Sequence, residues 1–318
     1  MQWPDGKEQA MYNVLVNRTL ILEYDKADKK REKEPKKIER VFSEVNSDIL
    51  EHKHVENYYD DFEREILLPH MTSRFGPGLA IGDLNGNGLD DIVIGGASQS
   101  TTGIYFQEEK GFVRKQGRIY PDERRYEDMG GLIFDADQDG DNDLYMVSGG
   151  NEFAHDSDLL QDRLYVNDGL GNLKKSSSAL PKMITSGSRV HSSDFDKDGD
   201  LDLFIGGRLV PGNYPLPANS YILENVSSKG RPKFVNITQK VAPILDKLGM
   251  VTDAIWSDYD NDGWTDLIVI GEWMPITILK NKKGFFHDVT RDLGLDKSTG
   301  WWFSINEGDF DNDGDMDY

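Results

Sequence analysis

The sequence predicts an all-β protein, a β-propeller built from four-stranded blades. An acidic nine-residue segment, Asp-x-Asp/Asn-x-Asp/Asn-Gly-x-x-Asp, occurs five times in the 318-residue chain, and successive copies start 51 to 64 residues apart. Each copy follows a short run of small and apolar residues, and each of the first four leads into a β-branched or aromatic run that ends in glycine. A unit that recurs at such intervals is typical of repeat architectures.

Each repeat predicts one blade. The runs before the acidic segments include GPGLAIGD, GGLIFD and VTDAIWSD, and the runs after them are IVIGG, LYMVSGG, LFIGG and LIVIG. Each pair predicts two strands joined by an acidic turn. A second hairpin follows, for example in RLYVNDGLGNLKKSS from Arg163 and in ITILKNKKGFFHDVT from Ile276. Four strands per unit match a propeller blade, and neighbouring blades must stack because one blade cannot bury both of its faces alone.

The residues before the repeats have a different composition. Residues 1–26 predict extended chain, with apolar stretches around Val14–Val16 and Thr19–Tyr24. Residues 27–37 are nearly all charged and predict a solvated linker. The repeat domain is therefore expected to span 38–318, with four complete units and a fifth that ends inside its loop.

The composition of the chain argues against several classes of function. The net charge of −21 argues against nucleic acid as a partner, because phosphate contacts need clustered Lys and Arg. There is no cysteine, which excludes disulfides, thiolate metal sites and a cysteine nucleophile. No apolar run approaches the roughly 20 residues that a transmembrane helix needs.

The five acidic segments predict calcium-binding loops. Ca²⁺ takes six to eight oxygen ligands in a flexible geometry. Positions 1, 3, 5 and 9 offer side-chain oxygens, position 7 offers its backbone carbonyl, and the glycine at position 6 permits the chain reversal. The predicted ligands are Asp83, Asn85, Asn87, Leu89 and Asp91 in the first loop; Asp135, Asp137, Asp139, Asp141 and Asp143 in the second; Asp194, Asp196, Asp198, Asp200 and Asp202 in the third; Asp258, Asp260, Asp262, Trp264 and Asp266 in the fourth; and Asp309, Asp311, Asp313, Asp315 and Asp317 in the fifth.

Other interpretations of these loops fit less well. An EF-hand needs a Glu at position 12, where this chain has Ile94, Met146, Ile205 and Val269. Magnesium demands stricter octahedral geometry, and purely structural acidic turns would not repeat the same ligand positions five times. Because the first loop carries Asn85 and Asn87, we expect it to be the weakest complete site. The fifth loop ends at Asp317, before the strand that is expected to follow it.

The repeat resembles the FG-GAP/VCBS repeat of integrin-α-type propellers, most fully in FGPGLAIGDLNGNGLDDIVIGGA from Phe75 to Ala97. That resemblance implies calcium within each blade. The opening stretch WPDGKEQAMYNVLVNRTLILEY resembles the end of an ASPIC/UnbV domain, and HKHVENYYDDFEREILLPH resembles the segment before the first loop in cartilage acidic protein-like relatives. The resemblance implies that residues 1–26 are the C-terminal part of an ASPIC/UnbV-like domain and that the chain is a piece of a longer protein.

These observations predict an extracellular, periplasmic or cell-surface module that binds a protein or carbohydrate ligand, with structural calcium and no catalytic activity of its own. No dinucleotide, phosphate-loop or nucleophile-elbow motif occurs. The alternative is a polysaccharide lyase or hydrolase built on a calcium-bearing propeller. Two further features have two interpretations each. The His52-Lys-His54 pair could place two imidazoles on one strand face as metal ligands, or simply belong to a polar strand face. Four tryptophans could stack on sugars or pack between blades, namely Trp256, Trp273, Trp301 and Trp302.

Overall fold

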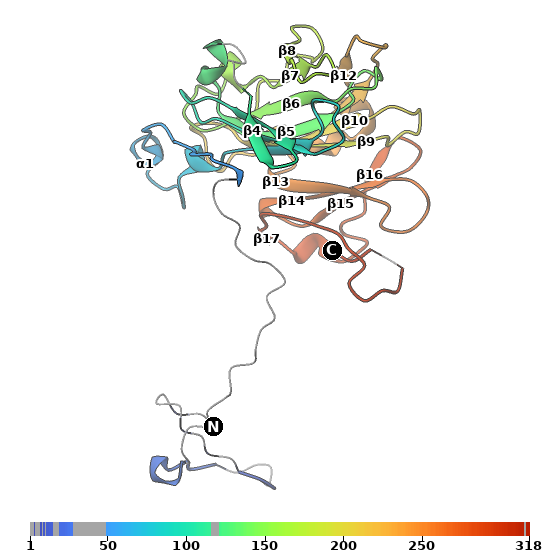
Figure 1. Cartoon of the computed structure of the whole chain (residues 1–318). Coiled ribbons are helices and arrows are strands. Elements are labelled where there is room, and N and C mark those ends of the chain that lie inside the picture. The colour runs from blue at the N-terminus through green and yellow to red at the C-terminus, as the bar shows by residue number, and fades with distance from the viewer. Residues whose placement is uncertain are drawn as a thin grey trace. The chain divides into compact units, whose positions relative to one another are not determined.

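The computed structural model describes residues 3, 7, 9, 11–14, 19–27, 49–115, 121–314 and 316–318. The chain divides into two units, Met1–Asn46 and Ser47–Tyr318 (Figure 1). The described part of the first unit has one 3₁₀ turn, Tyr24–Lys26, and contains no strand, although Glu23 is extended. The charged linker after residue 27 and the predicted start of the repeats at residue 38 lie outside the described residues.

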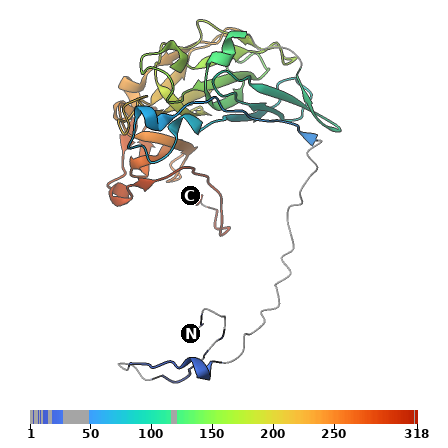
Figure 2. The same cartoon turned by 90° about the vertical axis from the view of Figure 1, so that its left-hand side faces the viewer.

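The second unit contains four antiparallel sheets whose strands pair in sequence order (Figures 1 and 2). The first sheet consists of β1 Leu79–Gly82, β2 Asp91–Ile94, β3 Gly103–Glu108 and β4 Gly111–Arg114. The second consists of β5 Asp128–Phe134, β6 Asp143–Ser148, β7 Arg163–Val166 and β8 Lys174–Lys175. The third consists of β9 Ser186–Ser193, β10 Asp202–Leu209, β11 Tyr221–Asn225 and β12 Phe234–Asn236. The fourth consists of β13 Met250–Ser257, β14 Asp266–Met274, β15 Thr277–Asn281 and β16 Phe286–Asp288, and its β14 also pairs with β17 Gly300–Trp301.

These sheets confirm the predicted blades. In every sheet the acidic loop joins the first two strands, and its ninth residue is the first residue of the second strand. The hairpins predicted from Arg163 and Ile276 are β7–β8 and β15–β16. The repeated acidic segment and the apolar runs on either side of it therefore predicted both the strands and the position of each loop between them.

The core lies between successive sheets. Leu144 and Met146 of β6 pack with residues of the first sheet, such as Val93. Tyr145 and Val147, on the other face of β6, pack with residues of the third sheet, such as Leu203. A third cluster fills the space between the third and fourth sheets. Because alternate residues of one strand point to opposite faces, each central strand contributes to the two cores on either side of it.

The first strands of neighbouring sheets approach closely. β1 contacts β5, β5 contacts β9, and β9 contacts β13. A Cβ atom on Gly78 would lie 2.5 Å from the backbone nitrogen of Gly130, so only glycine fits at this contact. The result is an all-β propeller fold in which four blades are stacked around their first strands.

Helices are few in the described residues. α1 covers Asp61–Arg64 and α2 covers Thr238–Val241, and short 3₁₀ turns lie at Thr72–Arg74, Pro121–Arg125, Asp158–Leu160, Pro243–Leu245 and Leu295–Lys297. Within this part of the chain no helix has the length and apolar character that crossing a membrane requires.

Candidate metal centres in the blade loops

The five acidic loops share one backbone conformation. The glycine at position 6 has a positive φ in every copy: 82° at Gly88, 101° at Gly140, 100° at Gly199, 87° at Gly263 and 94° at Gly314. Position 4 is also left-handed, and it is occupied by Gly86, Gln138, Lys197, Asn261 and Asn312. The glycine at position 6 was predicted, whereas the left-handed residue at position 4 was not. Its only signal in the sequence is the Gly or Asn found there in three copies.

The aspartate at position 1 closes each turn. One of its carboxylate oxygens accepts a hydrogen bond from the N–H of the glycine at position 6, over 2.7 Å from Gly88 to Asp83 and 3.1 Å from Gly140 to Asp135. The third, fourth and fifth loops repeat this bond at 3.2, 2.7 and 3.1 Å. The side chain of the predicted ligand at position 1 is therefore oriented by the loop itself.

The aspartate at position 9 connects the loop to the third strand of its blade. In the second loop, Asp143 Oδ2 accepts from Ala136 N (3.2 Å) and Asp143 Oδ1 accepts from Asn167 N (2.8 Å). Asp266 makes the same pair of contacts with Tyr259 and Asn281. Asp91, Asp143, Asp202 and Asp266 are all at most 1% exposed. Position 9 is therefore a structural residue as well as a predicted ligand.

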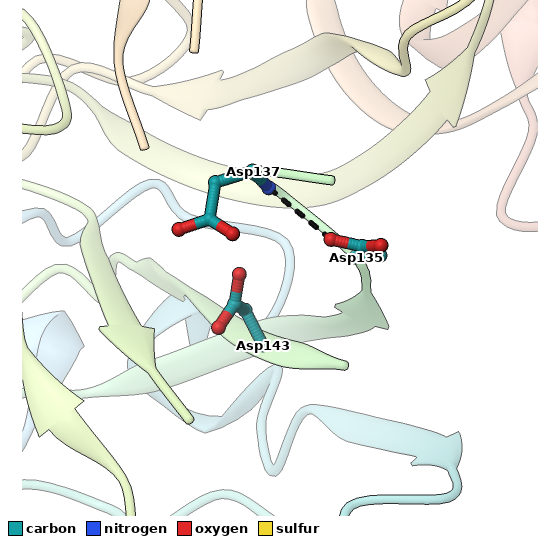
Figure 3. Close-up of side chains that lie close together, drawn as sticks. All are labelled: Asp135, Asp137 and Asp143. Atoms are coloured by element: carbon teal, nitrogen blue, oxygen red, sulfur yellow. Dashed lines mark hydrogen bonds between the residues drawn. The ribbon is translucent and has the colours of Figure 1, made fainter. Parts of the chain in front are cut away.

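Carboxylates converge in four of the five loops. In each set, one ligand atom from every residue lies within 4.8 Å of the others; the sets are Asp135, Asp137 and Asp143; Asp194, Asp196 and Asp202; Asp258, Asp260 and Asp262; and Asp309, Asp311 and Asp317. Figure 3 shows the side chains of Asp137 and Asp143 pointing toward one another, with Asp135 beside them. The first loop has amides at Asn85 and Asn87, and so carries fewer carboxylates.

The second and third loops contain carboxylate oxygens without partners. Both oxygens of Asp137, Oδ1 of Asp141, Oδ1 of Asp200 and Oδ2 of Asp202 are buried and have no hydrogen-bond partner among the described residues. Burial, followed by neighbouring carboxylates, raises the pKa of Asp143 to about 7 and that of Asp202 to about 8, although hydrogen bonds from Asn167 and Asn225 oppose these shifts. Unpaired hard oxygens at this spacing fit a dication such as Ca²⁺.

The carboxylates at position 5 bond to the backbone of their own loops. Asp139 and Asp198 are not in the converging sets; each accepts the backbone N–H of its own loop's position 7, both at 3.2 Å. In the fourth loop Asp262 belongs to the converging set and also accepts from Trp264 N at 2.9 Å. The backbone carbonyls of position 7, including those of Leu89 and Trp264, remain predicted ligands. Asp315 lies outside the described residues.

An asparagine at the end of the third strand links neighbouring loops, and sequence analysis missed it. Asn281 Nδ2 donates to the carbonyl of Phe195 in the preceding blade's loop (2.8 Å) and to that of Thr265 in its own loop (2.9 Å). The equivalent bonds of Asn225 reach Ala136 and Leu201, at 3.1 and 3.2 Å, and those of Asn167 reach Leu84 and Asn142, both at 2.7 Å. We call these three residues the bracket asparagines. The signal in the sequence is the recurring Asn in YVN, LEN and LKN.

The fourth loop also contacts a cation from its own blade. Lys280, the residue before Asn281 on β15, donates through Nζ to Asp260 Oδ2 and lies 3.0 Å from Asp262 Oδ2. These contacts raise the pKa of Lys280, and its bond to Asp262 lowers the pKa of that carboxyl group. The carboxylates of positions 3 and 5 therefore have a partner in this blade.

The candidate tryptophans lie in two kinds of environment, against the core and on the surface. Trp256 is partly buried and packs against the core, with its ring stacked on Phe195 at 6.0 Å. Trp273 and Trp301 are 56% and 39% exposed, and their rings meet edge to face at 5.1 Å. Trp302 is exposed as well.

His52 and His54 have different hydrogen-bond partners. His52 bonds to the hydroxyl of Tyr105 (2.7 Å), and His54 bonds to Glu56 (2.7 Å). The structure therefore does not bring this pair together as a metal site.

Sequence comparison with known families agrees with this geometry. The family model described as an FG-GAP-like repeat matches residues 135–205 and 258–318, and the FG-GAP repeat model matches residues 75–120. All five acidic loops fall within the matched segments, which together cover more than half of the chain. No curated protein matches the sequence. The fold and the loops define a propeller with carboxylate-rich blade hairpins. The chain is an FG-GAP repeat protein.

Proposed function

We propose that this chain is a calcium-stabilised binding module that acts outside the cytosol and presents a propeller surface to a protein or glycan ligand. The observation that carries the proposal is the set of buried carboxylate oxygens without partners in the second and third loops, on Asp137, Asp141, Asp200 and Asp202. A hard dication would supply the missing partner. Calcium suits the set better than magnesium because it accepts many oxygen ligands at flexible angles.

Calcium would act here as a structural brace. In the second blade Asp135 directly follows β5 and Asp143 begins β6, so an ion held by both would fasten these two strands at the loop. The bracket asparagine Asn225 would pass that order to the next blade, because its side chain bonds to the carbonyl of Ala136 in this loop. Without the ion, the clustered carboxylates repel one another.

Calcium binding supports the proposed location, and exposed aromatic side chains support the proposed kind of ligand. Calcium outside cells is concentrated enough to fill even weak sites, which favours an extracellular, periplasmic or cell-surface setting. The exposed pair Trp273 and Trp301 offers aromatic faces for a sugar or a protein side chain. We further propose that residues 1–26 derive from an ASPIC/UnbV-like domain, on the basis of the motif resemblance alone.

Thermal unfolding of the whole chain tests the calcium proposal. Saturating Ca²⁺ is expected to raise Tm by at least about 5 °C relative to chelator, since ligand binding to the folded state stabilises it by mass action. Asp137→Ala should reduce this gain. The control Asp158→Ala, which removes an exposed aspartate outside the loops, should retain it. Identical melts of the unaltered chain in Ca²⁺ and in chelator would sink the proposal.

We propose no catalytic role for the module. The rival function, cleavage of a polysaccharide by a calcium-bearing propeller, predicts release of oligosaccharides when the chain is incubated with a panel of acidic and neutral glycans. The binding module predicts retention on immobilised glycan or protein without such release. Tryptophan fluorescence of Trp273→Ala against the unaltered chain would show whether the exposed indoles take part.

A further inference from the structure

The blades differ at the residue that precedes the bracket asparagine. In the second blade this residue is Val166, in the third it is Glu224, and in the fourth it is Lys280. Each lies in the third strand of its blade, immediately before an asparagine. The backbone N–H of that asparagine bonds to the position-9 aspartate, so the three residues occupy equivalent places in register. The side chain at this position is therefore apolar in the second blade, acidic in the third and basic in the fourth.

The basic residue reaches the metal-ligand oxygens of its own loop. Lys280 Nζ donates to Asp260 and lies 3.0 Å from Asp262, and both carboxylates belong to the converging set of the fourth loop. Its side chain is only 19% exposed. In the third blade the residue at this place, Glu224, carries the opposite charge.

The second and third loops hold carboxylate oxygens that are buried and lack partners among the described residues, on Asp137, Asp141, Asp200 and Asp202. The fourth loop has Trp264 at position 7, and its Asp260 and Asp262 are exposed. In the fourth loop the oxygens of positions 3 and 5 bind the ammonium group. An ammonium carries one charge and three donors, whereas Ca²⁺ carries two charges and takes six to eight oxygens, so the ion and the lysine compete for the same two carboxylates.

We propose that the ammonium group of Lys280 is the resident cation of the fourth loop, which Ca²⁺ must displace before it binds there. This inference rests on the proposed calcium function of the loops. It makes the fourth loop ordered without metal, while the second and third loops depend on metal for their order. On titration the fourth loop fills after the second and third.

Terbium luminescence can report the fourth loop. Tb³⁺ replaces Ca²⁺ at oxygen sites, and the indole of Trp264, at position 7 of this loop, is placed to sensitise its emission. The whole chain is titrated with Tb³⁺, with excitation of tryptophan, and bound Tb³⁺ is then displaced by Ca²⁺. Because the Trp264 ring also contacts Lys197 of the third loop, the part of the signal that Asp258→Ala removes is assigned to the fourth loop.

Two substitutions at position 280 test the competition. Lys280→Met is expected to raise the apparent affinity of the fourth loop for both ions by about tenfold, since it removes a positive charge that lies 3.0 Å from Asp262 Oδ2 and bonds to Asp260. Lys280→Glu, which copies the third blade, should raise it further. The matched control Lys282→Met removes the same charge from an exposed residue of the same hairpin and should shift the affinity by less than about twofold.

The outcomes separate this inference from the proposed function. Calorimetry that detects no Ca²⁺ binding by the unaltered chain refutes both. Calcium binding with equal affinities of the fourth loop in the unaltered chain, Lys280→Met and Lys280→Glu refutes the resident cation and leaves the calcium function standing. A lower melting temperature of Lys280→Met in chelator, reversed by Ca²⁺, supports the resident cation through a readout that does not depend on luminescence.

Discussion

Arg208 and Glu272 occupy the same place in successive blades and form a buried ion pair. Each lies six residues beyond the position-9 aspartate of its blade, and Arg208 Nη2 is 2.5 Å from Glu272 Oε1. Arg208 is 4% exposed and Glu272 is 1% exposed. His70 also lies 3.2 Å from the same oxygen. The pair connects the ends of β10 and β14, whereas the bracket asparagines connect the loops.

Removal of one partner from this pair should destabilise the fold strongly. Arg208→Met leaves the Glu272 carboxylate buried without its main partner, and we expect the free energy of unfolding to fall by about 3–5 kcal/mol. The double change Arg208→Met with Glu272→Leu should recover most of that loss, because no buried charge remains. Denaturant unfolding in saturating Ca²⁺ measures both. Lys182→Met, which breaks an exposed pair with Asp158, is the control and should change stability by less than about 1 kcal/mol. A double variant no more stable than the single would contradict this account.

Two aspartates of the second loop should respond oppositely to charge removal in chelator. Neither oxygen of Asp137 has a hydrogen-bond partner among the described residues, so Asp137→Asn relieves repulsion and should stabilise the metal-free chain by about 1 kcal/mol while it weakens calcium binding. Asp143 accepts from Ala136 and Asn167, so Asp143→Asn loses a buried acceptor and should destabilise the metal-free chain by about 1–3 kcal/mol. Unfolding curves in chelator give the sign. The same sign for both would show that the two positions do not have separate roles.

Loss of a bracket asparagine should weaken two blades together. Asn225→Leu keeps much of the side-chain volume but leaves the carbonyls of Ala136 and Leu201 without their donor, which we expect to cost about 2–4 kcal/mol. Hydrogen exchange should show faster opening of the loops that begin at Asp135 and at Asp194. Asn172→Leu is the matched control, because Asn172 is exposed and bonds to Asp168 within a hairpin turn. Opening confined to the third blade would contradict the linking role.

Glu127 should give the fold a pH dependence separate from the metal loops. Burial, and then the neighbouring Glu152 carboxylate, raise the pKa of Glu127 to about 9 from an ordinary value near 4.5. The folded chain therefore keeps a proton that the unfolded chain loses. The stability from this group is complete below about pH 4.5 and is lost as pH rises toward 9.

Glu127→Gln removes this dependence. At pH 8 and saturating Ca²⁺ it should raise the free energy of unfolding by roughly 2 kcal/mol, and its stability curve should be flatter than that of the unaltered chain between pH 5 and pH 9. The exposed residue Glu109 offers a control, Glu109→Gln, that should follow the unaltered chain. Parallel curves for Glu127→Gln and the unaltered chain would refute the assignment.

The repeat made much of this structure predictable. Five copies of one segment identified the strands on either side of it, the reversal at Gly140 and its equivalents, and the aspartates that converge in four of the loops. A single copy would have looked like an ordinary turn. A repeat reveals the positions at which every copy has the same type of residue.

The residues that sequence analysis missed act through the pairing register of the strands, which a repeat along the chain does not reveal. Asn281 and Lys280 act on loops because β15 pairs with β14 so that Asn281 N meets Asp266, and that pairing is not visible from spacing along the chain. Trp256 was assigned to a surface platform as one option, but its place on β13 turns it toward Phe195 and the core. The left-handed conformation at Gln138 and Lys197 follows from the loop closing around it, not from residue preference.

The bracket at Asn225 also bears on glycosylation. Asn225-Val-Ser and Asn236-Ile-Thr are both acceptor sequons of the Asn-x-Ser/Thr type. Asn225 is 2% exposed and donates its amide to two carbonyls, so an oligosaccharyltransferase has no access to it once the third blade has formed. Asn236 is exposed on the outer strand of the same blade. In a cell that modifies such sequons, a glycan at Asn225 would record a chain that was modified before it folded, and a glycan at Asn236 is compatible with the finished blade.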